Sequence, residues 1–219
     1  LNNNQIITMK SFKIFTILAV ILSQMTGLFA GTPVDGSKKS KTTLFQGVVN
    51  EVSYFLTSKG VVFENELNLV WGDNEAVIYG VDEAGNYEEI LTGIVANDEA
   101  KKIVYENIYF NIDLVVYPED NALTYEFIVY PGGNPEDISL TTEGGLIQKM
   151  SENGNVLIQK ESNEMVATSP LAYQEDISGN KKVINAAFNI ENEMMVVETG
   201  NYEQAQVLTI TYKQNVSRN

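Results

Sequence analysis

The sequence predicts an all-β protein with an antiparallel β-sandwich-like domain, built either as one unit or as two packed β subdomains. Short runs of β-branched and aromatic residues recur along the chain, separated by clusters of Gly, Asn and Asp. Such spacing is typical of strands joined by hairpins. After residue 30, no window of helical length carries a sustained apolar face. Together these patterns favour a sandwich-like β architecture.

Residues 123–130 form the clearest predicted strand. Alternate positions fall on one face of a strand, so one face is fully apolar and the other is only partly polar. The two faces hold, respectively, Leu123, Tyr125, Phe127 and Val129, and Thr124, Glu126, Ile128 and Tyr130. We expect a central strand whose second face is half covered, ended by a tight loop at residues 131–135 because proline cannot continue a ladder. Asn153 and Gly154 predict a hairpin turn further along.

The first thirty residues predict an export signal. Met9 is the expected start, which makes residues 1–8 upstream overrun. Lys10 and Lys13 precede a short apolar run, and Ala30 supplies the small residue that signal peptidase requires. A membrane-spanning helix needs roughly 20 apolar residues, and polar residues interrupt this run too early. We therefore expect a signal peptide at 9–30, a flexible leader at 31–43, a β domain at 44–212 and a tail at 213–219.

The composition excludes several classes of function. Removing residues 1–30 takes away two lysines and no acid, which leaves 12 basic and 29 acidic residues and a net charge of −17. Such a surface repels phosphate backbones, so we expect no nucleic-acid partner. The chain has no second long apolar run after residue 30, so we expect no membrane span in the mature chain. The chain has no His and no Cys. It therefore has no Ser-His-Asp or Cys-His site, no thiolate or imidazole metal site and no disulfide, and we expect no cofactor.

Two stretches of the chain resemble a known family. Residues 105–117 read Tyr-Glu-Asn-Ile-Tyr-Phe-Asn-Ile-Asp-Leu-Val-Val-Tyr, and residues 123–138 contain Tyr125, Phe127, Pro131, Gly132 and Pro135 in family spacing. Pro170, Tyr173 and Gln174 fit its Pro-x-Ala-Tyr-Gln strand. These motifs resemble a bacterial domain of unknown function at the N-terminus of SBBP-type β-propeller-repeat proteins and gliding-motility-type surface or secreted proteins. Phe110 and Asn111 replace the usual Pro-Gly of that pattern.

The resemblance implies a surface or secreted location and supplies no catalytic residues. We interpret its shared positions as structural: Tyr105, Glu106, Asn107, Asp113, Tyr125, Phe127, Pro131, Gly132, Pro135, Pro170, Tyr173 and Gln174.

Asp113 is the first candidate for chemistry, because it lies in a strand-like run where Val115 and Tyr117 face the same way. Either it serves as a cation ligand or catalytic acid, or it accepts hydrogen bonds from the nearby turn around residues 105–107; we favour the second interpretation. Glu126 could pair with Asp113 or Glu106 as in glycoside hydrolases, which need carboxylates about 5 to 9.5 Å apart.

Other features admit two interpretations each. The turns at residues 73–75, 119–121 and 151–153 are rich in oxygen and suit calcium, although Asn and Asp are common in turns. Trp71 and the tyrosines could stack on sugar rings or pack in the core. Met194 and Met195 indicate core filling.

The sequence thus favours a non-catalytic secreted or cell-surface β-module for adhesion, assembly or ligand presentation. Its expected partner is a surface polysaccharide or another surface protein. A carbohydrate-binding module is the first alternative, and a carboxylate-dependent glycoside hydrolase is the second.

Overall fold

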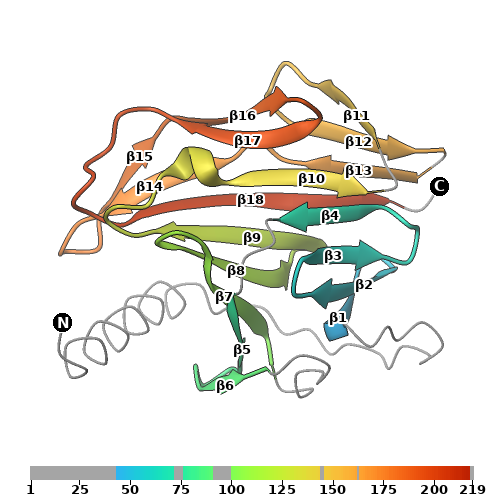
Figure 1. Cartoon of the computed structure of the whole chain (residues 1–219), viewed down its shortest axis with the longest axis horizontal. Coiled ribbons are helices and arrows are strands. Elements are labelled where there is room, and N and C mark those ends of the chain that lie inside the picture. The colour runs from blue at the N-terminus through green and yellow to red at the C-terminus, as the bar shows by residue number, and fades with distance from the viewer. Residues whose placement is uncertain (1–42, 72–75, 91–99, 144–145, 162, 218–219) are drawn as a thin grey trace.

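The computed structural model describes residues 43–71, 76–90, 100–143, 146–161 and 163–217. The predicted export signal at 9–30, almost all of the leader and the oxygen-rich turn at 73–75 lie outside the described residues. Two antiparallel sheets pack together as an open sandwich, so the prediction of an all-β sandwich-like fold is confirmed (Figure 1). The part of the chain that is described contains no helix that is both long enough and apolar enough to cross a bilayer.

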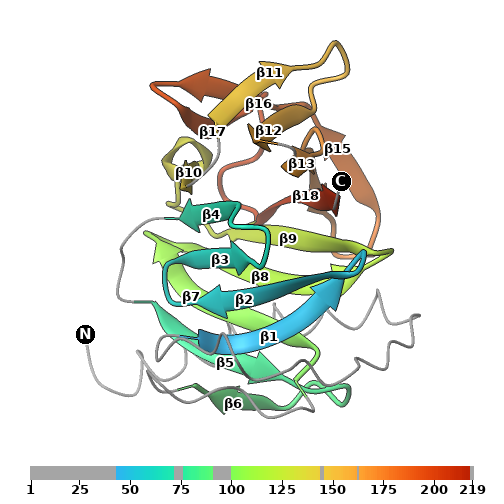
Figure 2. The same ribbon diagram turned by 90° about the vertical axis from the view of Figure 1, so that its right-hand side faces the viewer.

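The smaller sheet has seven strands, which can be followed in order in Figure 2. They are β1 (Thr43–Val49), β2 (Val52–Thr57), β3 (Gly60–Phe63), β4 (Asn68–Trp71), β10 (Ser139–Glu143), β17 (Met194–Thr199) and β16 (Ala186–Glu191). The order brings the first four strands of the chain beside three from its later half. The sheet is therefore held together by long-range pairs such as Leu140 with Trp71.

The larger sheet has eleven strands. Nine lie in one path: β11 (Leu146–Met150), β12 (Val156–Lys160), β13 (Asn163–Ala167), β18 (Leu208–Ser217), β9 (Ala122–Val129), β8 (Ile112–Glu119), β7 (Lys102–Tyr109), β5 (Val77–Val81) and β6 (Tyr87–Glu89). The hairpin of β14 (Leu171–Glu175) and β15 (Lys181–Ile184) branches from β18. β18 runs to Ser217, so residues 213–217 belong to a central strand and are not the tail that the sequence suggested.

The predicted strand at 123–130 is β9, which pairs with β8 on one side and β18 on the other. All eight of its residues are buried, so both faces are covered, more than the half-covered second face that we expected. The loop after it contains the short 3-10 helix η2 (Pro135–Asp137), capped by the Asn134 side chain, which accepts from Glu136 N. The sharp end of β9 at the proline-glycine loop is thereby confirmed.

Aromatic rings join the two sheets in one core. Trp71 of β4 meets the ring of Tyr105 edge-on at 5.2 Å, and Tyr125 stacks on Tyr212 at 4.8 Å. Tyr105 also donates its hydroxyl to the carbonyl of Thr57 in the smaller sheet at 2.9 Å. A buried tyrosine hydroxyl needs such a partner, so this bond fixes the larger sheet against the smaller one. Core filling, expected of Met194 and Met195, is confirmed for Met195, which is fully buried, whereas Met194 is half-buried.

Three hairpins share one five-residue turn that the sequence analysis did not identify. In each, the backbone N–H of the first residue donates to the carbonyl of the fifth, the glycine at position four donates to the first carbonyl, and its φ is near +80°. The first side chain also accepts from the fifth backbone N–H, at 2.8 to 3.0 Å. The turns are residues 82–86, 151–155 and 176–180, reading Asp/Ser-x-x-Gly-Asn. The hairpin predicted at Asn153 and Gly154 is one of them and is confirmed.

Replacing Gly179 with alanine should lower the free energy of unfolding by about 1–2 kcal/mol, because its φ of +81° is unfavourable for a residue with a Cβ. The added Cβ itself meets nothing closer than 3.7 Å, so the strain is purely conformational. Urea unfolding measures the change. Gly200→Ala is the control, since its φ is ordinary and its Cβ would find only normal contacts. Equal effects of both substitutions would contradict the assignment of the turn.

Candidate functional site

The face of the larger sheet that points away from the smaller sheet gathers most of the chain's candidate chemistry, and we call it the outer face. Strand register places Glu106, Asp113 and Glu126 there, because Asp113 pairs with Ile128 and Val115 pairs with Glu126. Five tyrosines share the face: Tyr79, Tyr87, Tyr117, Tyr130 and Tyr173. The three carboxylates that the sequence singled out therefore lie near one another on adjacent strands.

Asp113 holds the β7–β8 hairpin in shape. Its side chain is fully buried, and its Oδ1 accepts a hydrogen bond from the backbone N–H of Asn107 at 2.7 Å. Asn107 has a φ of +55° within an irregular part of β7, so its N–H leaves the ladder and needs another acceptor. The expectation that Asp113 accepts from the turn around residues 105–107 is confirmed.

Glu106 is buried beside three tyrosines. The hydroxyl of Tyr79 donates to its Oε2 at 3.2 Å, and the ring of Tyr87 meets that of Tyr79 edge-on at 5.9 Å. Burial raises the pKa of Tyr79 to about 12, with a further contribution from the Glu106 charge. Burial likewise raises the pKa of Tyr87 to about 12, and it raises that of Tyr130 beside Asp113. These phenols stay protonated at neutral pH, and that of Tyr79 donates its hydrogen bond to the Glu106 carboxylate.

Glu126 occupies the middle of a second group on the same face. It is 4% exposed, and the hydroxyl of Tyr173 donates to its Oε1 at 3.4 Å. Lys181 lies over the ring of Tyr173 at 4.0 Å, and Lys102 lies over the ring of Tyr117 at 4.2 Å. Burial raises the pKa of Glu126, while the charges of Lys102 and Lys181 oppose that shift.

The remaining strand residues of the family pattern lie on the inner side. Tyr105, Tyr125 and Phe127 are fully buried between the sheets. Trp71, proposed from sequence as a ligand contact, is 1% exposed and packs edge-on against Tyr105 and Tyr125. Because neither face of the indole reaches solvent, the interpretation of Trp71 as a ligand contact does not fit this structure. A tryptophan can form a stacking surface for a sugar ring, but the alternation of side chains along β4 places this one between the two sheets.

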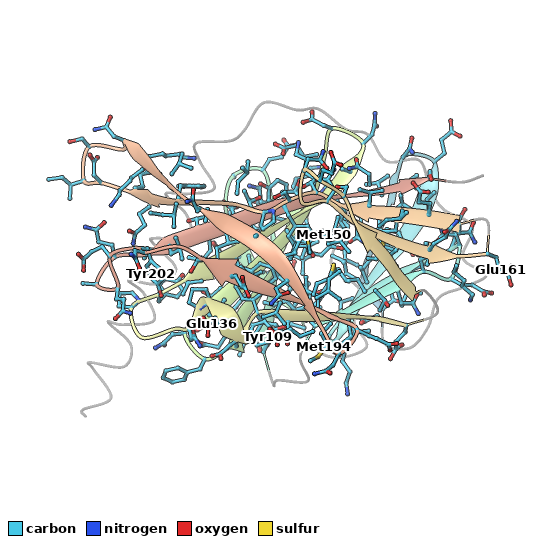
Figure 3. The ribbon with its side chains drawn as sticks, turned by 90° about the horizontal axis from the view of Figure 1, so that it is seen from above. Tyr109, Glu136, Met150, Glu161, Met194 and Tyr202 are labelled. Carbon is cyan, nitrogen blue, oxygen red and sulfur yellow. The ribbon has the colours of Figure 1, made fainter. Side chains whose placement is uncertain are left out.

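The motif loops form a compact support at one end of the sheets. Asn111 turns the β7–β8 hairpin with a φ of +55°, and its carbonyl accepts from Tyr130 N at 2.9 Å. Gly132 has a φ of +91°, and Pro135 begins η2. Asn tolerates the left-handed region that glycine prefers, so the replacement of Pro-Gly by Phe110-Asn111 keeps the turn. Tyr109, close to η2 in Figure 3, donates its hydroxyl to the carbonyl of Ser139 at 2.6 Å.

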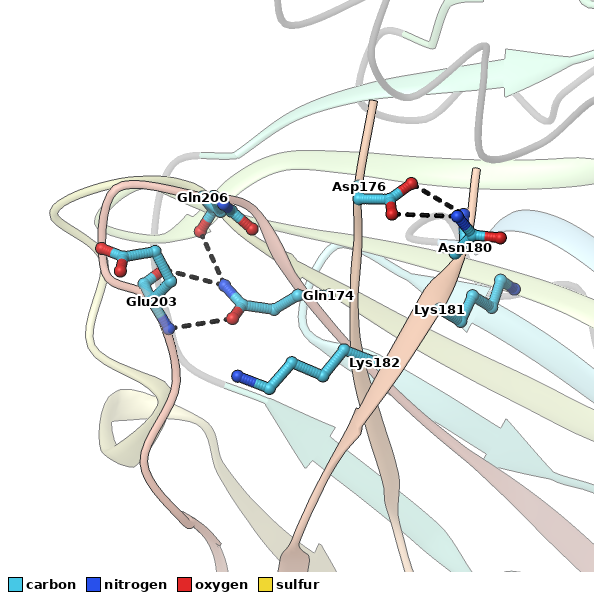
Figure 4. A pocket seen from close by; sticks show the side chains of 7 residues that line it. All are labelled: Gln174, Asp176, Asn180, Lys181, Lys182, Glu203 and Gln206. Atoms are coloured by element: carbon cyan, nitrogen blue, oxygen red, sulfur yellow. Dashed lines mark hydrogen bonds between the residues drawn. The ribbon is translucent and has the colours of Figure 1, made fainter. Parts of the chain in front are cut away.

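A polar pocket of about 400 Å³ lies beside the motif residue Gln174 (Figure 4). The Gln174 amide is 3% exposed and joins β14 to the loop before β18: it accepts from Glu203 N at 2.9 Å and donates to the carbonyls of Glu203 and Gln206. Asp176 and Asn180 bond to each other. The hydrogen bonds of the Gln174 amide are therefore made within the protein, and none of its polar atoms is left for a ligand in the pocket. Gln174 and the buried Pro170 instead hold the loop in place.

The hairpin of β14 and β15 carries three of the four large hydrophobic residues that are more than half exposed in the described ranges. The exposed fractions are 66% for Leu171, 108% for Ile177 and 76% for Val183. Of the large hydrophobic residues more than half exposed in the described ranges, only Phe110, at 74%, lies elsewhere. Exposed apolar groups that cluster mark contact surfaces more often than scattered ones do. Sequence reasoning missed this cluster because alternating apolar residues in a strand indicate a core face.

The described part of the chain contains no group of three or more acidic residues arranged to hold a metal ion. The turn at 119–121 instead holds Lys213, whose Nζ lies 3.1 Å from Glu119 and 2.6 Å from Asp120. The turn at 151–153 belongs to the five-residue hairpin described above.

Comparison with known proteins gave one match. A family model described as a domain of unknown function, DUF7948, matches residues 66–211. No curated protein and no solved structure matched. The matched range contains every motif position named above, and the sandwich shows what those positions do in the fold.

Replacing Glu126 with glutamine should change how stability depends on pH. Because burial raises the folded-state pKa above the ordinary value of 4.5, ionising Glu126 costs the folded state stability as the pH rises above that value. We expect the variant to be at least as stable as the parent at pH 8, with the advantage shrinking toward pH 4.5. Urea unfolding between pH 4.5 and pH 8 measures the difference in the free energy of unfolding between variant and parent. Glu161→Gln, at an exposed position, is the control. An advantage that grows as the pH falls would contradict the burial argument.

Proposed function

The chain belongs to the DUF7948 family of domains of unknown function, so its role must be inferred from the surface of the molecule, and we propose that it is a non-catalytic secreted or cell-surface β-module. Its role would be adhesion, assembly or ligand presentation, with a surface polysaccharide or another surface protein as partner. The observation that carries this proposal is the contrast between the buried, internally bonded acids and the exposed apolar β14–β15 hairpin.

The acids are engaged in holding the fold. Asp113 accepts from Asn107 N, Glu106 from Tyr79 and Glu126 from Tyr173. All three are at most 8% exposed, so a substrate would first have to open the sheet face. This burial argues against the glycoside hydrolase, although the three carboxylates share one face.

The exposed hairpin supplies the contact surface that a module needs. Leu171 and Val183 lie on its outer face with Tyr173, and Ile177 lies at its tip. The predicted export signal supports placement outside the cytoplasm, and the net charge of −17 that remains after residues 1–30 are removed favours solubility and disfavours nucleic acid. The resemblance to modules that precede propeller repeats in surface proteins points the same way.

Export is the part of this proposal that is tested most simply. Expressed in a bacterial host, the full chain should appear outside the cytoplasm with a new N-terminus near Gly31, because residues 9–30 have the order of a signal peptide. Cell fractionation and N-terminal sequencing measure this, and a variant lacking residues 9–30 should stay in the cytoplasm. Exported protein that keeps Met9 or Lys10 would argue against cleavage, and cytoplasmic full-length chain would overturn the proposal.

Carbohydrate binding is a second candidate, favoured by the group around Glu126. Two tyrosine rings flank a carboxylate, and the Thr124 hydroxyl on the same face is buried with no hydrogen-bond partner among the described residues. Aromatic faces and buried hydrogen-bonding groups are what a sugar ring requires. Glu126 itself is buried, so a sugar reaches this group only when the exposed Lys181 moves off the ring of Tyr173.

A glycan array with Tyr173→Ala tests that candidate. We expect the parent to bind a restricted set of glycans, the variant to lose at least tenfold in affinity because one platform ring is gone, and Tyr202→Ala, a partly exposed tyrosine off this face, to keep binding. Uniformly absent binding by the parent would remove carbohydrate recognition, and equal loss in both variants would move it away from the outer face.

A further inference from the structure

Two edge strands of the larger sheet, β15 and β6, carry opposite charges. Through the branch at β18, the strands run β15-β14-β18-β9-β8-β7-β5-β6, each antiparallel to the next. Within the described ranges, β15 pairs only with β14 and β6 only with β5, so each is an edge strand of the sheet that these ranges form. β15 begins with Lys181 and Lys182, while β6 contains Glu88 and Glu89, and all four are exposed. In Figure 1, β15 and β6 lie well apart on the molecule.

The alternation of strand directions makes these edges compatible. Seven antiparallel steps separate β15 from β6, so the two strands run in opposite directions. A second copy placed edge to edge, and rotated to follow the twist of the sheet, would therefore present its β6 antiparallel to β15 of the first, and the outer face would continue from one copy to the next. No rotation that inverts the sheet is needed.

One register then places each of the three side chains of β6 opposite a complementary side chain of β15. Tyr87 and Glu89 lie on the outer face, since Tyr87 pairs with Val81 and Glu89 with Tyr79. Lys181 and Val183 also lie there, since Val183 pairs with Tyr173 and Lys181 with Glu175. Placing residue 88 opposite residue 182 brings together three complementary pairs: Glu89 with Lys181, Glu88 with Lys182, and Tyr87 with Val183. Opposite charges and aromatic–aliphatic pairs stabilise neighbouring strands.

We propose that β15 of one copy adds antiparallel to β6 of a second copy, so that this chain assembles head to tail through its larger sheet. Strand addition at an exposed edge is a general mode of recognition, and a heterologous contact that does not close on itself gives open chains. Exposed Val183 would be partly covered by Tyr87 of the added strand. This inference rests on the assembly role proposed above and names its partner as a second copy.

Charge reversal tests this contact, in protein that begins at Gly31 and at physiological salt. The wild type should show an average mass that rises with concentration in sedimentation velocity. Lys181→Glu/Lys182→Glu alone and Glu88→Lys/Glu89→Lys alone should each stay monomeric, because both of their edges then carry the same sign. An equimolar mixture of the two should associate again, since acidic and basic edges alternate. Glu191→Lys/Glu193→Lys, which changes net charge equally at exposed sites away from both edges, should associate like the wild type.

A cross-link tests the register independently. The natural chain has no cysteine, so Glu88→Cys mixed with Lys182→Cys should form a disulfide-linked heterodimer on mild oxidation, and Glu161→Cys mixed with Lys182→Cys should not. A wild type that is monomeric up to about 1 mM, or reversed variants that fail to associate when mixed, would overturn the proposal. Either result would leave export and surface location untouched, since those are measured separately by fractionation.

Discussion

The hydrogen bond from the Asn107 N–H to the buried Asp113 carboxylate is the constraint on which the outer face depends. It satisfies a backbone N–H in the irregular part of the β7–β8 ladder, where the strand register shifts. With that hairpin fixed, Asn111 meets the loop after β9 and Tyr109 reaches Ser139 of the smaller sheet. The motif residues in this region therefore have structural partners: Tyr105 bonds to the smaller sheet, and Asp113 holds the hairpin between β7 and β8.

The outer face shows how an acidic chain buries carboxylates without histidine or cysteine. Each acid is matched by a donor from a neighbouring strand: a backbone N–H for Asp113, a phenol for Glu106 and another phenol for Glu126. Burial keeps these phenols protonated, so they remain donors over the physiological pH range. The internal matching of charge and hydrogen bonds leaves the edges of the sheet, and the hairpin at one end of it, as the places where the molecule can meet another.

Much of the fold follows from local sequence, and much of the surface does not. Alternation and proline located β9 and its loop, and the short spacing between Asn107 and Asp113 made their bond foreseeable. The repeated Asp/Ser-x-x-Gly-Asn turn was also readable from the sequence. The gathering of Glu106, Asp113 and Glu126 was not, because it depends on which strands pair. Trp71 went inward and Leu171 stayed outside for the same reason: residue type indicates an apolar environment, and only the sheet order says which face is covered.

Hydrogen exchange at the Asn107 amide tests the structural role of the motif most directly. In the native protein this N–H lies outside the β ladder but donates to Asp113, so it should exchange as slowly as ladder amides of β8 and β9. In Asp113→Ala it should exchange rapidly while the β9 amides remain protected, and Asp113→Asn, which keeps an acceptor oxygen, should fall between. Rapid exchange at Asn107 in the native protein, or unchanged protection in Asp113→Ala, would contradict the account.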